Sequence, residues 1–194
     1  MANKYCTLEQ IKPYLSIESD EDDQLLNDII ERATRIIEVG TGRIFFCDTP
    51  TTEYYDYEHY RNHRGEIYLD KDLAEIVSIT NGDSTIVGTD KYVTNPNNFS
   101  PIESIKLKRN SSIYWTYTDT PENAIAINGY WAYSKTPPLD IVHACIRLTS
   151  FLYRQKDNAV DQDRAMGVGD GMMIFPVNIP KDVSNVLKFY QRIV

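Results

Sequence analysis

Two consecutive prolines, Pro137 and Pro138, constrain the folding of this chain more than any other feature. A proline inside a helix removes a hydrogen bond, and the residue before a proline is driven toward extended backbone. A helix therefore cannot begin before Pro138, which itself suits a first helical turn. Beyond it, apolar residues recur at the three- and four-residue spacing of one helical stripe: Ile141, Ala144, Cys145, Leu148 and Leu152. We predict a central amphipathic helix that needs apolar partners elsewhere in the chain.

The N-terminal region supplies the first partners. Thr7 and Gln10 have the spacing of a capping box, which predicts a short helix through Leu15 that Pro13 shortens or bends. A second helix is expected from about Asp22 to Val39, because apolar residues follow helical spacing there. Gly40 and Gly42 are expected to end it.

The C-terminal region supplies one more helix. Pro180 is expected to begin it, and the residues that share one face are Val183, Val186, Leu187 and Tyr190. The three- to four-helix bundle predicted by these patterns is assembled from both ends of the chain.

A β-rich region lies between the helical patterns. From Ile44 to Tyr133 the sequence alternates and is rich in β-branched and aromatic residues, with Gly, Asn, Asp or Pro at the segment boundaries. Asn81-Gly82 is expected to form a hairpin turn. The strand order stays open, and the expected strands are 51–57, 65–70, 75–80, 103–108, 112–117 and 123–133.

These patterns together predict an α+β fold, a small helical bundle with an inserted antiparallel β-rich subdomain. We expect three segments: residues 1–43 carry the N-terminal helices, 44–136 the β-rich insert, and 137–194 the central helix, a glycine-rich loop and the last helix.

Charge and composition narrow the function. A net charge of −8 argues against a dedicated DNA clamp, which needs Lys and Arg in a stripe. No apolar run has the length of a membrane span, and the N-terminus lacks a signal-peptide pattern, so no membrane partner is expected. Three scattered cysteines fit reduced thiols.

Candidate metal ligands are weak. His59 and His63 have a spacing that metal-binding pairs use on helices, but this segment is not expected to be helical and no third ligand is evident. The carboxylates of residues 20–23 suit an electropositive helix N-terminus better than a cation. We expect no metal and no cofactor.

No catalytic constellation is evident, so we do not expect an enzyme. Cys145 lies on the buried helical stripe and is expected to be a core thiol, and His143 an exposed or interface residue. The glycines of 167–171 follow a helix, unlike those of a phosphate-binding loop, so this segment is expected to be a pliable tether before a short apolar run, 172–175, that suits a strand.

The fourteen tyrosines of the chain offer amphipathic contact area, which suits surfaces that meet other proteins, although sheet propensity alone also explains them. Aromatic strands also stack single-stranded nucleic acid, but basic residues are too sparse around them in the sequence. One alternative is therefore a non-enzymatic protein- or carbohydrate-binding module that uses the β-insert.

Three stretches, in order along nearly the whole chain, resemble the head–tail connector (adaptor, head-completion) proteins of tailed bacteriophages. The stretch 31–46, ERATRIIEVGTGRIFF, resembles their early helix. Residues 128–157 and the strands before them look like the family's β-insert and following helix, and 167–194 is similar to its glycine loop, short strand and C-terminal helix. The chain departs from the pattern at Gln191, where a second basic residue is common.

The resemblance implies a structural virion protein, made in the host cytoplasm and located at the head–tail interface. Copies are expected to form a dodecameric ring on the portal protein after DNA packaging. A monomer in isolation is compatible with this expectation. The ring would extend the DNA channel without sequence-specific binding, and would offer a surface to the tail or to a stopper (head-closure) protein.

Two sets of contact residues follow from this resemblance. The portal-binding residues are expected at the C-terminus: Lys188, Phe189, Tyr190, Gln191 and Arg192. The inter-subunit loop is expected to use pliable and apolar residues: Met166, Gly167, Gly169, Gly171, Met172, Met173 and Phe175. The β-insert is expected to contribute to the same ring contacts.

Overall fold

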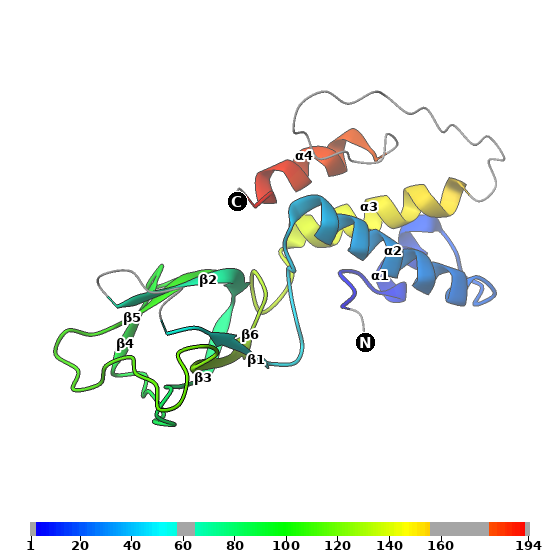
Figure 1. Ribbon diagram of the computed structural model, residues 1–194. Coiled ribbons are helices and arrows are strands. Elements are labelled where there is room, and N and C mark those ends of the chain that lie inside the picture. The colour runs from blue at the N-terminus through cyan, green and yellow to red at the C-terminus, as the bar shows by residue number, and fades with distance from the viewer. Residues whose placement is uncertain (1–2, 58–64, 156–178, 193–194) are drawn as a thin grey trace. The chain divides into compact units, whose positions relative to one another are not determined.

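The computed structural model describes residues 3–57, 65–155 and 179–192 (Figure 1). In this part of the chain it has four helices and two antiparallel three-stranded sheets, which confirms the prediction of an α+β fold. The chain divides into two compact units. We call Met1–Arg43 with Pro137–Val194 the helical unit, and Ile44–Thr136 the β unit.

The helices of the helical unit are α1 (Leu8–Leu15), α2 (Asp23–Thr41), α3 (Leu139–Gln155) and α4 (Lys181–Tyr190). The long helix α3 packs against the other three, so it is the centre of the unit, as its amphipathic pattern predicts (Figure 1). None of the described helices is long and apolar enough to cross a membrane.

Capping residues set the helix ends close to the predicted positions. The backbone N–H of Thr7 donates to Gln10 Oε1 at 3.0 Å, the reciprocal half of a capping box. Gly42 ends α2 in the left-handed conformation with φ 68°, which glycine adopts without strain. The expectation that Gly40 also ends the helix is wrong, because Gly40 is buried inside α2, which runs on to Thr41.

Apolar side chains from all four helices form the core of the helical unit. From α2 these are Leu26, Ile30, Ala33 and Ile37, and from α3 Ile141, Ala144, Cys145 and Leu148. Helix α4 is only 10 residues long and buries Val183 and Leu187. An isolated helix of this length is marginal in water, so α4 depends on burying these two side chains.

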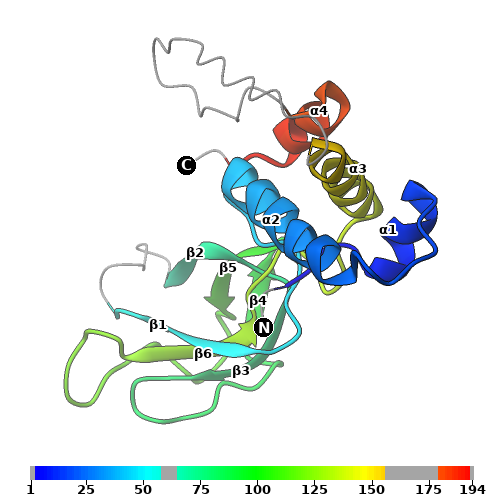
Figure 2. The ribbon, with the colours of Figure 1, turned by 90° about the vertical axis from the view of Figure 1, so that its right-hand side faces the viewer.

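The β unit has six strands in the described residues: β1 (Thr51–Tyr55), β2 (Glu66–Leu73), β3 (Glu75–Thr80), β4 (Tyr92–Asn95), β5 (Ile102–Leu107) and β6 (Ile125–Tyr130). One sheet has the order β1-β6-β3 and the other β2-β5-β4, both antiparallel (Figure 2). Strands β2 and β3 follow one another with only Ala74 between them, so the chain passes from one sheet to the other at that corner.

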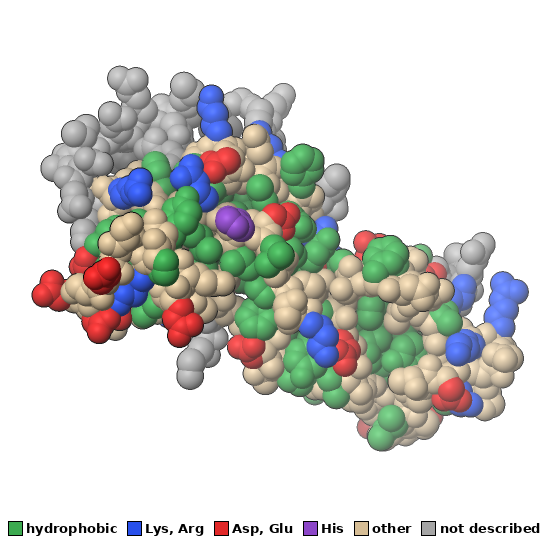
Figure 3. Space-filling model, turned by 180° about the vertical axis from the view of Figure 1, so that it is seen from behind, with side chains coloured by type: hydrophobic (Ala, Val, Ile, Leu, Met, Phe, Trp, Pro, Cys, Tyr) green, Lys and Arg blue, Asp and Glu red, His purple; other side chains and the backbone are tan. Residues whose placement is uncertain are grey.

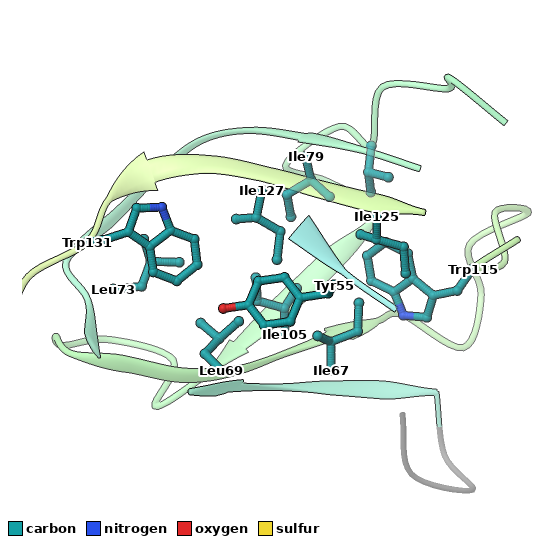
Figure 4. Packing of buried hydrophobic residues seen from close by; sticks show 11 residues of the cluster. Tyr55, Ile67, Leu69, Leu73, Ile79, Ile105, Trp115, Ile125, Ile127 and Trp131 are labelled. Atoms are coloured by element: carbon teal, nitrogen blue, oxygen red, sulfur yellow. The ribbon is translucent and has the colours of Figure 1, made fainter. Parts of the chain in front are cut away.

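The inward faces of both sheets share one hydrophobic core, which Figure 4 shows. Isoleucines of β2, β3, β5 and β6 meet there with the rings of Tyr55, Trp115 and Trp131. Tyr55 and Trp131 stack with ring centroids 6.1 Å apart. The aromatic richness of this segment therefore serves packing for part of its residues.

Three expectations for the β unit need correction. Residues 112–117 form no strand; Asn81 instead binds their backbone, donating to Tyr114 O at 2.8 Å and accepting from Thr116 N at 3.1 Å. Strand β4 was absent from the expected strands. The chain does reverse after β3, but over a wider turn in which Asn81 N donates to Thr85 O, and the residue with positive φ is Ser84 rather than Gly82.

Candidate interaction surfaces

Residues Tyr190 and Arg192 are tied to the rest of the helical unit. The Arg43 guanidinium donates to Tyr190 O at 2.8 Å, and the backbone N–H of Arg192 donates to Thr41 O at 2.9 Å. The Tyr190 hydroxyl binds the Asp140 carboxylate at the start of α3. Contacts with the end of α2 and with the start of α3 therefore fix the position of residues 190–192, at the end of α4.

These contacts divide the five predicted portal-binding residues into two groups. Tyr190 and Arg192 hold the segment to the helical unit, and Gln191 follows the helix end half-buried. Lys188 and Phe189 point outward, and the Phe189 side chain is 89% exposed. An exposed phenylalanine beside a cation, on a helix whose ends are both held, suits a rigid docking tip.

A shallow groove lies between α3 and α4, with a volume of about 440 Å³. Ala144, Val183 and Val186 give it an apolar surface, Leu139 is 81% exposed at its edge, and His143 also lines it. Figure 3 shows this face, where hydrophobic side chains gather beside the one histidine among the described residues. Leu139 directly follows Pro138 at the start of the helix, and no sequence pattern indicated its exposure.

One ion pair closes the groove. Arg147 Nε donates to Asp182 Oδ2 at 2.9 Å and so links α3 to the first turn of α4. The Arg147 guanidinium holds the pKa of the Asp182 carboxyl below its usual range. Tyr14 of α1 lies beside the same guanidinium, with its hydroxyl 3.4 Å from an Arg147 nitrogen.

The predicted inter-subunit loop, Met166 to Phe175, lies outside the described residues, as do the short strand at 172–175 and the pair His59 and His63. The other expected ring surface, the β unit, is described and exposes several aromatic side chains. Tyr54, Tyr68, Phe99 and Tyr114 are each at least half exposed.

Part of the acidic stretch after α1 has partners within the protein. Lys12 Nζ lies 2.5 Å from Asp20 and 2.9 Å from Asp23, and its charge lowers the pKa of the Asp20 carboxyl. The Asp22 carboxylate accepts a hydrogen bond from the Tyr153 hydroxyl of α3. Within the described ranges, no group of three or more His, Cys, Asp or Glu side chains is placed to hold a metal ion.

Cys145 is a core thiol, as predicted, with no exposed surface. Its sulfur lies 3.3 Å from that of Cys6, which is also buried. The neighbouring Cys145 thiol and burial together raise the pKa of Cys6 far above that of a free cysteine. Neither thiol has the electropositive, accessible surroundings of a nucleophile.

The comparisons with known proteins define the class. A family model described as "Head completion protein" matches residues 4–193, so this chain belongs to the head completion protein family. The resemblance found in the sequence is confirmed, and with it the structural role of a head–tail connector protein. A search of curated proteins found no match.

Solved structures share this fold at low sequence identity. A chain in the "Neck of empty GTA particle computed with C6 symmetry" matches with TM-score 0.57 and 13% identity over 96% of this chain and 89% of that chain. A chain in the "Virion of native gene transfer agent (GTA) particle" matches with TM-score 0.57 and 12% identity over the same shares. A chain of the "Neck of native GTA particle computed with C12 symmetry" matches with TM-score 0.50 and 14% identity, over 100% and 96%.

Proposed function

We propose that this protein is a non-enzymatic subunit that forms a ring on the portal after DNA packaging. The ring extends the DNA channel and presents its other end to the tail or to a stopper protein. The family assignment and the fold shared with neck chains of particles with C6 and C12 symmetry support this proposal. The protein is made in the host cytoplasm and its working place is the head–tail interface of the virion.

The observation that carries the portal contact is the tip formed by Lys188 and Phe189. The Phe189 side chain is 89% exposed, so its apolar surface stays in water and contributes no burial free energy to the monomer. On a partner it becomes a buried anchor of the kind that dominates binding energies. The hydrogen bonds of Tyr190 and Arg192 fix the backbone beyond it, so little conformational entropy is lost on docking.

A point substitution tests the tip better than a truncation. Removing everything after Leu187 also removes the Tyr190 and Arg192 contacts, so that variant loses the position of α4 as well as the tip. We expect Phe189→Ser to weaken capture by purified portal at least about ten-fold, in the range of an interface anchor. Phe99→Ser is the matched control, because Phe99 is 72% exposed in the β unit.

Equal capture of both variants would contradict the assignment of the tip to the portal. A loss with Phe99→Ser alone would move the portal contact to the β unit. Thermal unfolding of both variants checks that neither substitution changes the fold, which is expected because surface substitutions have small effects.

Ring closure needs a second pair of surfaces. In a closed ring one patch of each copy meets a different patch of the next copy. We assign these contacts to the glycine-containing loop, Met166 to Phe175, and to the β unit, with the exposed Tyr54 and Tyr68 as motivation for the latter. Deletion of residues 166–173 is expected to abolish ring assembly on portal particles, and unchanged assembly would contradict the loop's role.

A further inference from the structure

The β unit contains a basic pocket on an otherwise acidic chain. Its volume is about 510 Å³, and its lining includes Lys106, Lys108 and Arg109. No acidic residue is among the described residues that line it. The chain as a whole carries a net charge of −8, yet residues 104–118 hold three cations and no carboxylate. Such a local excess of one sign selects for ligands of the opposite sign.

The three cations form no ion pair within hydrogen-bonding reach in the described structure, although the charge of Lys108 helps to lower the pKa of the Asp90 carboxyl. None of them forms an ion pair with a described residue, whereas Lys91 close by is paired with Asp90 at 2.9 Å. Glu66 lies opposite Lys106 in the register of β2 and β5, and its carboxylate accepts from the Ser104 hydroxyl at 2.6 Å. Unpaired cations that converge on one hollow keep their full capacity to bind an anion.

Aromatic side chains stand beside these cations. Tyr57 and Tyr114 line the same pocket, and the Tyr114 ring is 77% exposed. Surfaces that bind nucleic acids combine cations, which contact phosphates, with exposed aromatic rings. A protein or peptide that binds through carboxylates would need the cations but not the rings. Tyr114 follows the cations closely in sequence, whereas Tyr57 is distant and is brought to them by the fold.

The pocket is preorganised by hydrogen bonds. The Trp115 indole N–H donates to Gly65 O at 2.8 Å, and the Ser111 hydroxyl donates to Lys108 O at 2.7 Å. Asn81 binds the backbone on both sides of Trp115, at Tyr114 and Thr116. The segment that carries Tyr114 is therefore fixed relative to the end of β5, and binding an anion does not require it to be ordered first.

We infer that this pocket binds the sugar–phosphate backbone of DNA, without reading the base sequence. The three cations contact phosphates, and Tyr57 and Tyr114 offer ring faces and hydroxyls to the adjoining sugars. The inference rests on the proposed function only in naming packaged DNA as the source of the phosphates. Three contacts per copy are weak, but a ring of copies repeats them around one duplex.

Binding of the purified full-length protein to a short fluorescent DNA duplex, followed by anisotropy over a series of salt concentrations, tests this site. We expect the logarithm of the binding constant to fall against the logarithm of salt with a slope of about −3, since each phosphate contact contributes about −0.9. Two duplexes of unrelated sequence are expected to bind equally.

Two triple variants with the same net charge, K106Q/K108Q/R109Q in the pocket and R32Q/R35Q/K181Q in the helical unit, separate the pocket from general charge effects. K106Q/K108Q/R109Q is expected to bind at least about ten-fold more weakly, and K106R/K108R/R109K to restore binding. The matched control R32Q/R35Q/K181Q removes three exposed cations of the helical unit and is expected to bind like the wild type.

Absence of duplex binding by the wild type at low salt would overturn the inference. So would equal losses of binding in K106Q/K108Q/R109Q and R32Q/R35Q/K181Q. Binding of a glutamate-rich peptide in the pocket, without binding of the duplex, would overturn it as well. Because no portal is present in this experiment, its failure leaves the tests of portal docking untouched.

Discussion

The Tyr190 hydroxyl lies 2.9 Å and 3.0 Å from the two carboxylate oxygens of Asp140, and this contact joins the end of α4 to the start of α3. The two residues are fifty positions apart, separated by most of α3, by residues 156–178, which the structure does not describe, and by most of α4. The contact holds Tyr190, the neighbour of the exposed Phe189, against the first turn of α3, which also exposes Leu139.

Tyr190→Phe is expected to lower the free energy of unfolding by about 0.5–1.5 kcal/mol, the net value of a typical hydrogen bond. The ring stays and only the hydroxyl is lost, so hydrogen exchange should accelerate in α4 more than in α2. Leu187→Ala is the contrasting variant, because it removes a fully buried side chain and should cost about 2–5 kcal/mol. Equal exchange in α4 of wild type and Tyr190→Phe would show that the hydroxyl does not hold the helix.

The Arg147–Asp182 pair makes the docking of α4 sensitive to acid. The pKa of Asp182 is lowered by Arg147 in the folded protein, so its contribution is present above the unfolded Asp pKa of about 4 and is lost as the pH falls through the lower folded value. Both side chains are about half exposed, and solvent screening keeps the contribution below about 1 kcal/mol.

Unfolding of wild type and Asp182→Asn at neutral and at acidic pH measures this contribution. The wild type should be more stable at neutral pH, and the difference should disappear once Asp182 is protonated. If the wild type remains more stable than Asp182→Asn at low pH, the substitution acts through the geometry of the start of α4 and not through the charge of Asp182.

Gly129 in the central strand β6 is expected to tolerate no side chain. A Cβ there would lie 2.5 Å from Glu75 O and 2.7 Å from Leu73 Cδ1, at the corner where the chain passes from β2 to β3. Gly129→Ala should therefore destabilise the β unit by about 1–3 kcal/mol, the usual cost of overpacking, or more if the backbone has to move. The measurement is denaturant unfolding followed by tryptophan fluorescence, since both tryptophans lie in the β unit.

Gly88→Ala is the matched control for Gly129→Ala. The Cβ at position 88 would approach only the end of the Asp90 side chain, which can rotate away. A loss of stability as large as that of Gly129→Ala would mean that the close approach at the corner is not the cause.

The three thiols are expected to react at two different rates. Cys6 and Cys145 are buried, and the pKa of Cys6 is raised, so both should resist a thiol reagent until the helical unit unfolds. Cys47 is half-buried, and burial raises its pKa more modestly, so it should react first in the native protein. Rapid reaction of all three thiols under native conditions would contradict the packing of Cys6 against α3.

Local signals predicted much of the fold. Thr7, Gly42 and Pro138 each act through backbone geometry, so the bounds of α1, α2 and α3 could be read within a few residues. The failure at 112–117 has the opposite cause: the backbone there is bound by the side chain of Asn81, a long-range contact that no alternation pattern reveals.

The candidate surfaces were harder to predict from the sequence than the fold. Phe189 was among the expected contact residues, but the exposure of Leu139 depends on which faces of α3 are covered, and an apolar residue in a helical pattern is usually assigned to the core. The basic pocket was missed because Lys106 lies near the end of β5, Lys108 and Arg109 follow the strand, and Tyr57 reaches them from a distant segment. The run of cations without a carboxylate was the available signal.

Imaging of portal particles after incubation with the purified protein tests the central claim most directly. The account predicts a closed ring of added density on the portal with wild type and with Phe99→Ser, and far fewer ringed portals with Phe189→Ser at the same protein concentration. Portals that stay bare with wild-type protein, while it remains folded, would contradict the claim that this chain is the ring-forming subunit between head and tail.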